Sequence, residues 1–186
     1  MKKKKMTAGT VTLFVLEKIF ELGMVPFEVF EATTSHGGFG KRTLSSALAS
    51  AQRSGYIKKA QKKAPKKTAP NSLLALTPKG RLRLLSERCK LASRETKPVW
   101  DRRWRILIFD IPERKRYLRD YLRQHLRSFG FACLHKSVWV TPYHTPTDLI
   151  RLLWELRVKI YTRYILTEHM DYEKDLLRKF NLATSA

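Results

Sequence analysis

The stretch WRILIFDIPERKRYLRDYLRQHLRSFG, residues 104–130, decides the fold of the second half of the chain. It begins with a continuous apolar run, which predicts a strand at the centre of a sheet. Pro112 and Glu113 then open a helix, which Gly130 ends. Asp110 is the one carboxylate in the apolar run, so its role is the first question that this sequence raises.

The residues after this stretch extend the pattern. A break near His135 splits residues 131–143 into two strands, and Thr147 caps the helix that follows. A further strand, rich in Val, Ile, Tyr and Thr, covers residues 158–169, and a short amphipathic helix comes after it. The order β-α-β-β-α-β predicts a ferredoxin-like α+β domain over residues 102–186.

The first half, residues 1–92, has a different order: three helices, a hairpin and a fourth helix. Thr10 is expected to cap the first helix, and Pro26 to open the second. The third helix covers residues 41–55, with Leu44, Ala47, Leu48 and Ala51 facing inward. Its opposite face carries small polar and basic side chains: Lys41, Arg42, Thr43, Ser46, Ser50 and Arg53.

This order predicts a winged helix-turn-helix over residues 1–92. The major groove of DNA admits one helix, and that helix needs an apolar inner face and a polar, basic outer face. The hairpin tip is expected to hold phosphates without reading bases, through six lysines: Lys58, Lys59, Lys62, Lys63, Lys66 and Lys67. Residues 93–101 are predicted to link the two domains.

The charge of the chain indicates an anionic partner. It has 38 Lys and Arg against 16 Asp and Glu, a net charge of +22, and the first 99 residues carry most of the excess. Such a surface attracts polyanions, and nucleic acid is the first candidate. No apolar segment is long enough for a membrane span, and Cys89 and Cys133 form neither a zinc motif nor a disulfide framework. A cytoplasmic protein without a membrane partner is expected.

The second half resembles the central domain of the PaaX-type transcriptional repressors, which is similar to the CRISPR adaptation subunit and reputed endonuclease. The shared features are an apolar strand ending in Asp110-Ile111-Pro112, an Arg-rich helix from Arg114 to Arg127, Gly130, and Ser137-Val138-Trp139. The resemblance covers roughly residues 100–170, and it implies a winged helix before this domain. His135 and Lys136 depart from the family pattern, and no small-molecule effector is inferred.

The resemblance also gives Asp110 a candidate role. In the CRISPR adaptation subunits, the aspartate at this position is the proposed magnesium ligand, paired with its copy across a dimer. Asp110 is therefore a candidate metal ligand and catalytic residue. Magnesium favours several hard oxygen ligands, and only Glu113 is near in sequence. The alternative is that Asp110 caps the next helix or pairs with Arg105 or Arg114.

Three hypotheses follow, of which the last is a non-specific nucleic-acid binder with equal affinity for any duplex. The first is a homodimeric, sequence-specific regulator that binds double-stranded DNA, a repressor as the resemblance implies, with no cofactor and no catalysis. The second is a CRISPR adaptation subunit or a magnesium-dependent endoribonuclease or endodeoxyribonuclease fused to a winged helix. The sequence names neither an operator nor an effector ligand.

Overall fold

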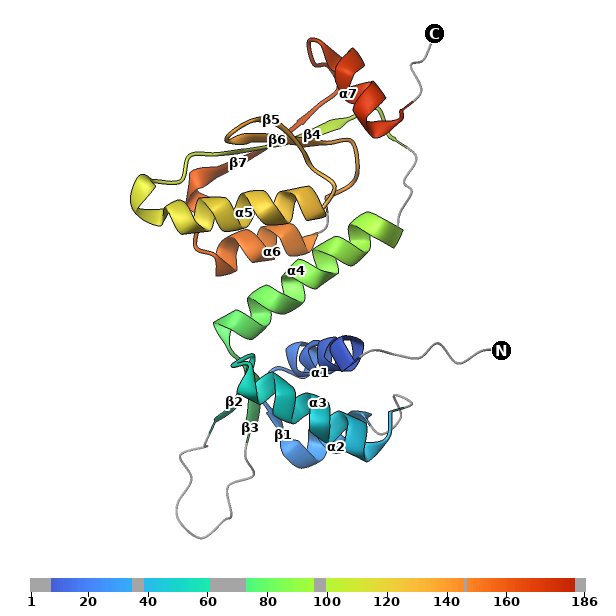
Figure 1. Cartoon of the computed structure of the whole chain (residues 1–186), viewed down its shortest axis with the longest axis vertical. Coiled ribbons are helices and arrows are strands. Elements are labelled where there is room, and N and C mark those ends of the chain that lie inside the picture. The colour runs from blue at the N-terminus through green and yellow to red at the C-terminus, as the bar shows by residue number, and fades with distance from the viewer. Residues whose placement is uncertain (1–7, 35–38, 61–72, 96–99, 146, 183–186) are drawn as a thin grey trace, which may run out of the picture. The chain divides into compact units, whose positions relative to one another are not determined.

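The computed structural model describes residues 8–34, 39–60, 73–95, 100–145 and 147–182 (Figure 1). The chain divides into two compact units, residues 1–84 and 85–186. The division falls inside one continuous helix, α4 (Pro78–Glu95). This helix takes up the first residues of the segment 93–101 that was expected to be a linker, and residues 96–99 lie outside the described part of the chain.

The first unit consists of helices around a small antiparallel sheet of strand order β1-β3-β2. Its elements in chain order are α1 (Ala8–Leu22), β1 (Val25–Pro26), α2 (Phe27–Thr34), α3 (Lys41–Arg53), β2 (Ile57–Ala60) and β3 (Leu73–Leu76). The predicted hairpin is present, and it pairs Ile57 with Leu76 and Ala60 with Leu73. The tip between these strands, with Lys62, Lys63, Lys66 and Lys67, lies outside the described residues.

Two predicted helix starts in this unit are wrong. The first helix begins at Ala8, so Thr10 lies inside it and does not cap it. Pro26 belongs to β1, opposite Leu73, and not to the first turn of α2. A proline is tolerated there because β1 is an edge strand, where a missing N–H donor costs the sheet little.

A close contact joins the hairpin to the start of α4. The backbone N–H of Gly80 donates to Thr77 Oγ1 over 3.1 Å, so Thr77 caps α4. The same hydroxyl donates to the carbonyl of Gly55 over 2.6 Å. A Cβ at Gly80 would lie 2.1 Å from the carbonyl oxygen of Tyr56, so only glycine fits this approach. The first turns of α4 are thereby fixed to the sheet, and Leu84 is fully buried in the core of the unit.

The second unit contains a four-stranded antiparallel sheet of order β5-β6-β4-β7. Its elements in chain order are β4 (Trp104–Phe109), α5 (Arg116–Ser128), β5 (Ala132–His135), β6 (Val138–Thr141), α6 (Thr147–Glu155), β7 (Thr162–Thr167) and α7 (Glu173–Phe180). The central strand β4 is the apolar run of the sequence, as expected. Order and connection follow the predicted ferredoxin-like pattern.

Two boundaries in this unit differ from the prediction. Short 3-10 helices, Glu113–Lys115 and Lys159–Tyr161, precede α5 and β7. The helix predicted from Pro112 therefore becomes α-helical only at Arg116. Tighter 3-10 turns are common where a chain enters or leaves a regular element, and residue propensities do not distinguish them from α-helix.

Different helices pack on the two faces of this sheet. Figure 1 shows α5 and α6 together on one face, where Leu122, Leu126 and Leu152 are fully buried. On the opposite face Leu176 and Leu177 of α7 pack on a cluster that includes Trp104. The later turns of α4 belong to this unit and contact α6 through Arg88, whose Nε lies 2.8 Å from Asp148 Oδ2.

The protein is therefore a mixed α+β chain with two antiparallel sheets. Among the described residues, no helix combines the length and the apolar character that crossing a bilayer requires.

Candidate nucleic-acid interface

Helix α3 has two chemically distinct sides. Leu44, Ala47, Leu48 and Ala51 are buried, as predicted from their helical spacing. The other side is the α3 face, in which Ser50 is half-buried and the rest are exposed: Lys41, Arg42, Thr43, Ser46, Ser50 and Arg53. The four buried side chains pack α3 against the core, so the side chains of the α3 face have a fixed orientation.

The α3 face borders a shallow groove. Arg42, Thr43, Ser46, Ser50 and Arg53 line it from α3, together with Ala47, and Val11 and Thr12 line it from α1. The contribution of α1 could not be predicted from the sequence, because nothing in the local pattern of residues 8–22 distinguishes a groove wall from an ordinary surface.

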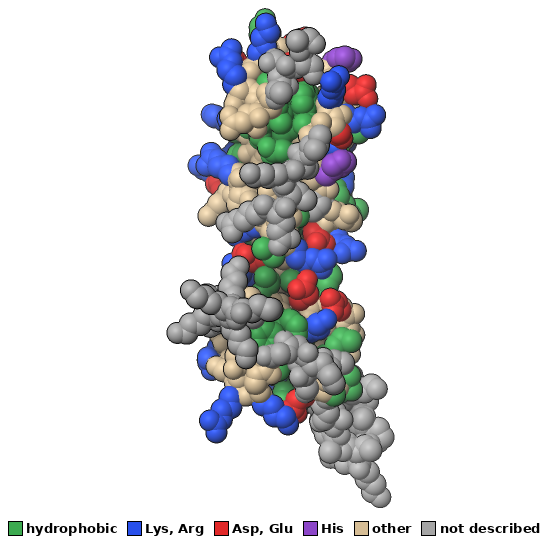
Figure 2. All heavy atoms as spheres, turned by 90° about the vertical axis from the view of Figure 1, so that its right-hand side faces the viewer, with side chains coloured by type: hydrophobic (Ala, Val, Ile, Leu, Met, Phe, Trp, Pro, Cys, Tyr) green, Lys and Arg blue, Asp and Glu red, His purple; other side chains and the backbone are tan. Residues whose placement is uncertain are grey.

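The electrostatics of the α3 face are positive. Lys41 Nζ lies 3.5 Å from Glu31 Oε1, and both side chains are well exposed. No ion pair joins Arg42 or Arg53 to another described residue. On the face drawn in Figure 2, Lys and Arg side chains project from the surface of each unit. Lys58 and Lys59 add two exposed charges on β2, next to the hairpin tip.

Asp110 lies in a second concave region, the Asp110 hollow. Its lining includes Asp110, Glu113, Arg116, Arg119, Arg123 and Lys136. The backbone N–H of Asp110 donates to the carbonyl of Tyr161 over 2.9 Å. Within the described residues its carboxylate has no hydrogen bond or ion pair. The predicted roles as helix cap and as partner of Arg105 are wrong: Pro112 is the N-cap of the following 3-10 helix, and Arg105 binds another residue.

The acids and arginines around Asp110 are already paired. Arg119 binds Glu113 and holds the pKa of that carboxyl below its usual value, and it also donates to the carbonyl of Ile111 over 3.2 Å. Arg123 donates from Nε to the carbonyl of Lys136 over 2.9 Å. The guanidinium groups of Arg119 and Arg123 are thus held in place around the hollow. With Arg116 and Lys136, the basic side chains that line it outnumber its two carboxylates.

A resident magnesium ion fits this donor set poorly. Magnesium favours several oxygen ligands in octahedral geometry. Asp110 offers one carboxylate, Glu113 is bound by Arg119, and the other charged neighbours repel a cation. Within the described ranges, no three His, Cys, Asp or Glu side chains gather as metal ligands would. One chain alone therefore does not form the predicted site.

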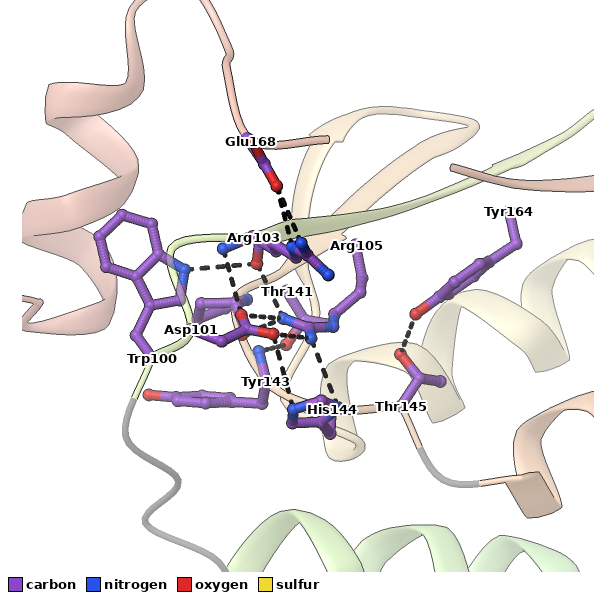
Figure 3. Close-up of polar contacts among 11 residues, drawn as sticks. Trp100, Asp101, Arg103, Arg105, Thr141, Tyr143, His144, Thr145, Tyr164 and Glu168 are labelled. Carbon is purple, nitrogen blue, oxygen red and sulfur yellow. Dashed lines mark hydrogen bonds and ion pairs between the residues drawn. The ribbon is translucent and has the colours of Figure 1, made fainter. Parts of the chain in front are cut away.

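The buried Arg105 organises a separate polar network, shown in Figure 3. Its guanidinium binds both carboxylate oxygens of Asp101 and donates to the carbonyls of Arg103 and Pro142, each over 2.8 Å. Arg105 is only 3% exposed, so these acceptors replace its hydration. The pairing lowers the pKa of Asp101 from 3.8 to about 2. His144 lies at the edge, with Nε2 3.6 Å from Asp101 Oδ2.

The tryptophans beside this network serve packing. Trp104 is fully buried, 5.2 Å from the ring of Trp100 and 6.0 Å from that of Phe180, between ring centroids. Its Nε1 donates to Glu173 over 3.2 Å. A side chain so enclosed is not available to stack on a base.

The second unit is thus an antiparallel, ferredoxin-like sandwich with an Arg-rich first helix and a lone aspartate at the end of its first strand. Residues 97–177 match the family model described as the PaaX protein central Cas2-like domain. This match covers less than half of the chain, and it supports a PaaX-like protein with a Cas2-like domain. A comparison with curated proteins finds no match.

Proposed function

We propose that the chain is a sequence-specific regulator that binds double-stranded DNA as a homodimer, with its first unit acting as a winged helix. The observation that carries this proposal is the division of α3 into a buried apolar row and an outer row of small polar and basic side chains. A helix of this kind can enter the major groove while its own unit holds it rigidly.

The order of elements around α3 supports this interpretation. A helix, a short strand and two further helices precede an antiparallel hairpin, and α2 and α3 stand in the positions of a helix-turn-helix pair. The groove at the α3 face would accept one strand of the duplex, with α1 contacting its backbone. Lys58 and Lys59 lie on an edge strand, where they would meet phosphates.

The second unit supports the homodimer. Its edge strand β7 leaves three large side chains exposed by 38 to 50%: Tyr164, Ile165 and Leu166. Edge strands with exposed apolar side chains are templates for pairing with another chain. Two copies would present two α3 faces to two half-sites. Repression is the mode of regulation that the family resemblance implies.

The test begins with selection of bound duplexes from a random pool, with magnesium and with EDTA. We expect a dyad-symmetric site that is enriched equally under both conditions. On that site Arg42→Ala should cost about 1–3 kcal/mol and relax one base position. Arg42→Lys is the matched control: it keeps the charge but loses two-pronged contact with guanine, so nonspecific affinity should persist while specificity falls.

The phosphate contacts have a separate test. Lys58→Ala and Lys59→Ala should each weaken binding to all duplexes alike, and each should reduce the slope of log affinity against log salt by about 1. Ser46→Ala should change base preference without changing that slope. Equal enrichment of every sequence, or full specificity in Arg42→Ala, would refute the assignment of the α3 face.

The alternative, a magnesium-dependent nuclease or CRISPR adaptation subunit, keeps one supporting observation: the Asp110 carboxylate has no partner among the described residues, and it lies in a cationic hollow. It needs a second copy to bring further oxygen ligands to Asp110. Cutting that requires magnesium and disappears in Asp110→Asn would favour it over the regulator.

A further inference from the structure

A hollow in the first unit lies beside α3, on the side away from the groove that Arg42, Thr43, Ser46, Ser50 and Arg53 line. Lys41, the first residue of the helix, was assigned to the α3 face but lines this hollow and not the groove. The volume of the hollow is about 300 Å³, at the lower end of the range of small-molecule sites. Most of its lining is apolar, with polar side chains at Glu31, Lys41 and Ser45. The lining residues come from α2 and from α3 with the residues just before it: Phe27, Phe30, Glu31, Phe39, Gly40, Lys41, Leu44, Ser45 and Leu48. We call it the α2–α3 hollow.

The floor of the hollow belongs to the core of the unit. Phe30, Leu44 and Leu48 are 2%, 7% and 6% exposed and are members of the core cluster. Phe27 and Phe39 are half-buried and pack against that cluster from its edge. The ring of Phe39 also lies 4.9 Å from that of Phe14 on α1. The walls are therefore supported by three helices, as a pre-formed site requires.

Water is a poor occupant of this space. A stable buried water makes two to four hydrogen bonds. Among the lining residues, the polar side chains are an ion pair, Lys41 with Glu31, and one hydroxyl, Ser45. A concave apolar surface that water wets badly gains free energy when an apolar molecule covers it.

We propose that the α2–α3 hollow binds a small, flat, mainly apolar ring compound. Three phenylalanine rings line the space, and aromatic rings pack on one another by offset stacking or edge to face. The volume suits a body of one or two fused rings. A hydroxyl or ring N–H on the ligand could bond to Ser45 or to the carboxylate of Glu31.

This site would act on α3. Leu44, Ser45 and Leu48 line the hollow, whereas Thr43, Ser46 and Ser50 line the groove on the other side of the same helix. A ligand that favours one position of α3 changes the affinity of the α3 face for DNA. By thermodynamic linkage, bound DNA then changes the affinity of the hollow for the ligand by the same factor. This second step rests on the proposed function, whereas ligand binding itself does not.

The first experiment measures binding to the full chain without DNA. Indole is the flat probe, and cyclohexanol, a saturated ring with one hydroxyl, is the control that is not flat. Binding is followed by calorimetry and ligand-observed NMR. We expect saturable binding of indole with a dissociation constant below about 1 mM, and at least fivefold weaker binding of cyclohexanol. Equal affinity for both would overturn the aromatic class, and absence of saturable indole binding would overturn the site.

Two neighbouring serines give a matched pair of variants. Ser45 and Ser46 are both exposed on α3, but only Ser45 lines the hollow. Ser45→Phe should weaken indole binding at least tenfold, whereas Ser46→Phe should leave it within twofold. Phe27→Ala removes one wall and should weaken binding at least fivefold. If all three variants bind indole as the wild type does, the probe lies elsewhere and the assignment is wrong.

The last experiment separates the two proposals. Saturating indole should change the affinity for a selected duplex at least threefold in the wild type and not in Ser45→Phe. If indole binds at the hollow and the chain binds no duplex at all, the proposed function fails and the ligand site stands. If the duplex binds and indole has no effect on it, the coupling through α3 is refuted.

Discussion

The network around Arg105 allows a quantitative prediction for Asp101→Asn. Removing the carboxylate charge leaves a buried guanidinium with neutral acceptors only. Breaking a buried ion pair costs roughly 3–5 kcal/mol. The loss here should be smaller, because the carbonyls of Arg103 and Pro142 still accept from Arg105 and the Asp101 side chain is 31% exposed. We expect the free energy of unfolding to fall by about 2 kcal/mol at pH 7.

The pKa of Asp101 gives an independent magnitude. Its fall from 3.8 to about 2 corresponds to at most roughly 2.5 kcal/mol, which screening at this partly exposed side chain reduces to about 1 kcal/mol. Because the folded pKa is depressed, this stabilisation is fully present above about pH 4. It is lost as the pH falls from there to about 2. The gap between wild type and Asp101→Asn should therefore narrow over that interval.

The assay can follow the second unit alone. All four tryptophans, at positions 100, 104, 139 and 154, belong to that unit, so their fluorescence reports its unfolding in urea. Arg105→Met is the matched variant: it removes the buried charge and keeps the apolar stem. The double variant Asp101→Asn/Arg105→Met should be about as stable as Arg105→Met alone, since the acid has then lost its partner. Additive losses, or a loss below about 0.5 kcal/mol in Asp101→Asn, would refute the importance of the pair.

Three further predictions concern other parts of the chain. Gly80→Ala should destabilise the first unit by more than about 2 kcal/mol and abolish binding to duplexes, because its Cβ meets the Tyr56 carbonyl; Gly40→Ala, where a Cβ meets open space, is the control in thermal unfolding. Iodoacetamide at pH 8, mapped by mass spectrometry, should modify the exposed Cys133 and spare Cys89, because burial raises the pKa of the Cys89 thiol to about 12; prior modification of Cys89 would contradict its burial. Asp110→Asn should bind the selected duplex in EDTA within twofold of the wild type, and a larger loss would give Asp110 a role in binding.

The sequence predicted the parts of the fold that depend on periodicity. The inward residues of α3, Leu44, Ala47, Leu48 and Ala51, could be identified because a helix returns to the same face every three or four positions. The apolar run of β4 was long enough to mark a central strand, and the two apolar ends around a Lys/Pro-rich middle were enough to mark a hairpin, though not its register. The α3 face was then the opposite side of an assigned helix.

The partner of Arg105 could not be predicted in the same way. Asp101 reaches Arg105 because the chain turns at Arg102, which has a φ of 60° that few residues other than glycine adopt. No propensity marks an arginine for that conformation. The pairing of Arg105 with Asp110, however, could have been rejected. The two residues are five apart along a strand, so their side chains point to opposite faces.

The role of Asp110 depends on its charged surroundings, which the local motif does not specify. Three arginines near Asp110 pair with only two acidic side chains. Glu113 binds Arg119 and lies near Arg116, and Asp120 binds Arg123 and also lies near Arg116. The excess positive charge would attract a phosphate whether or not Asp110 takes part in any reaction. Nucleic acid bound at this hollow would therefore not be evidence of catalysis. Only turnover that needs both the metal and the Asp110 carboxylate would be, because the arginines alone can account for the binding.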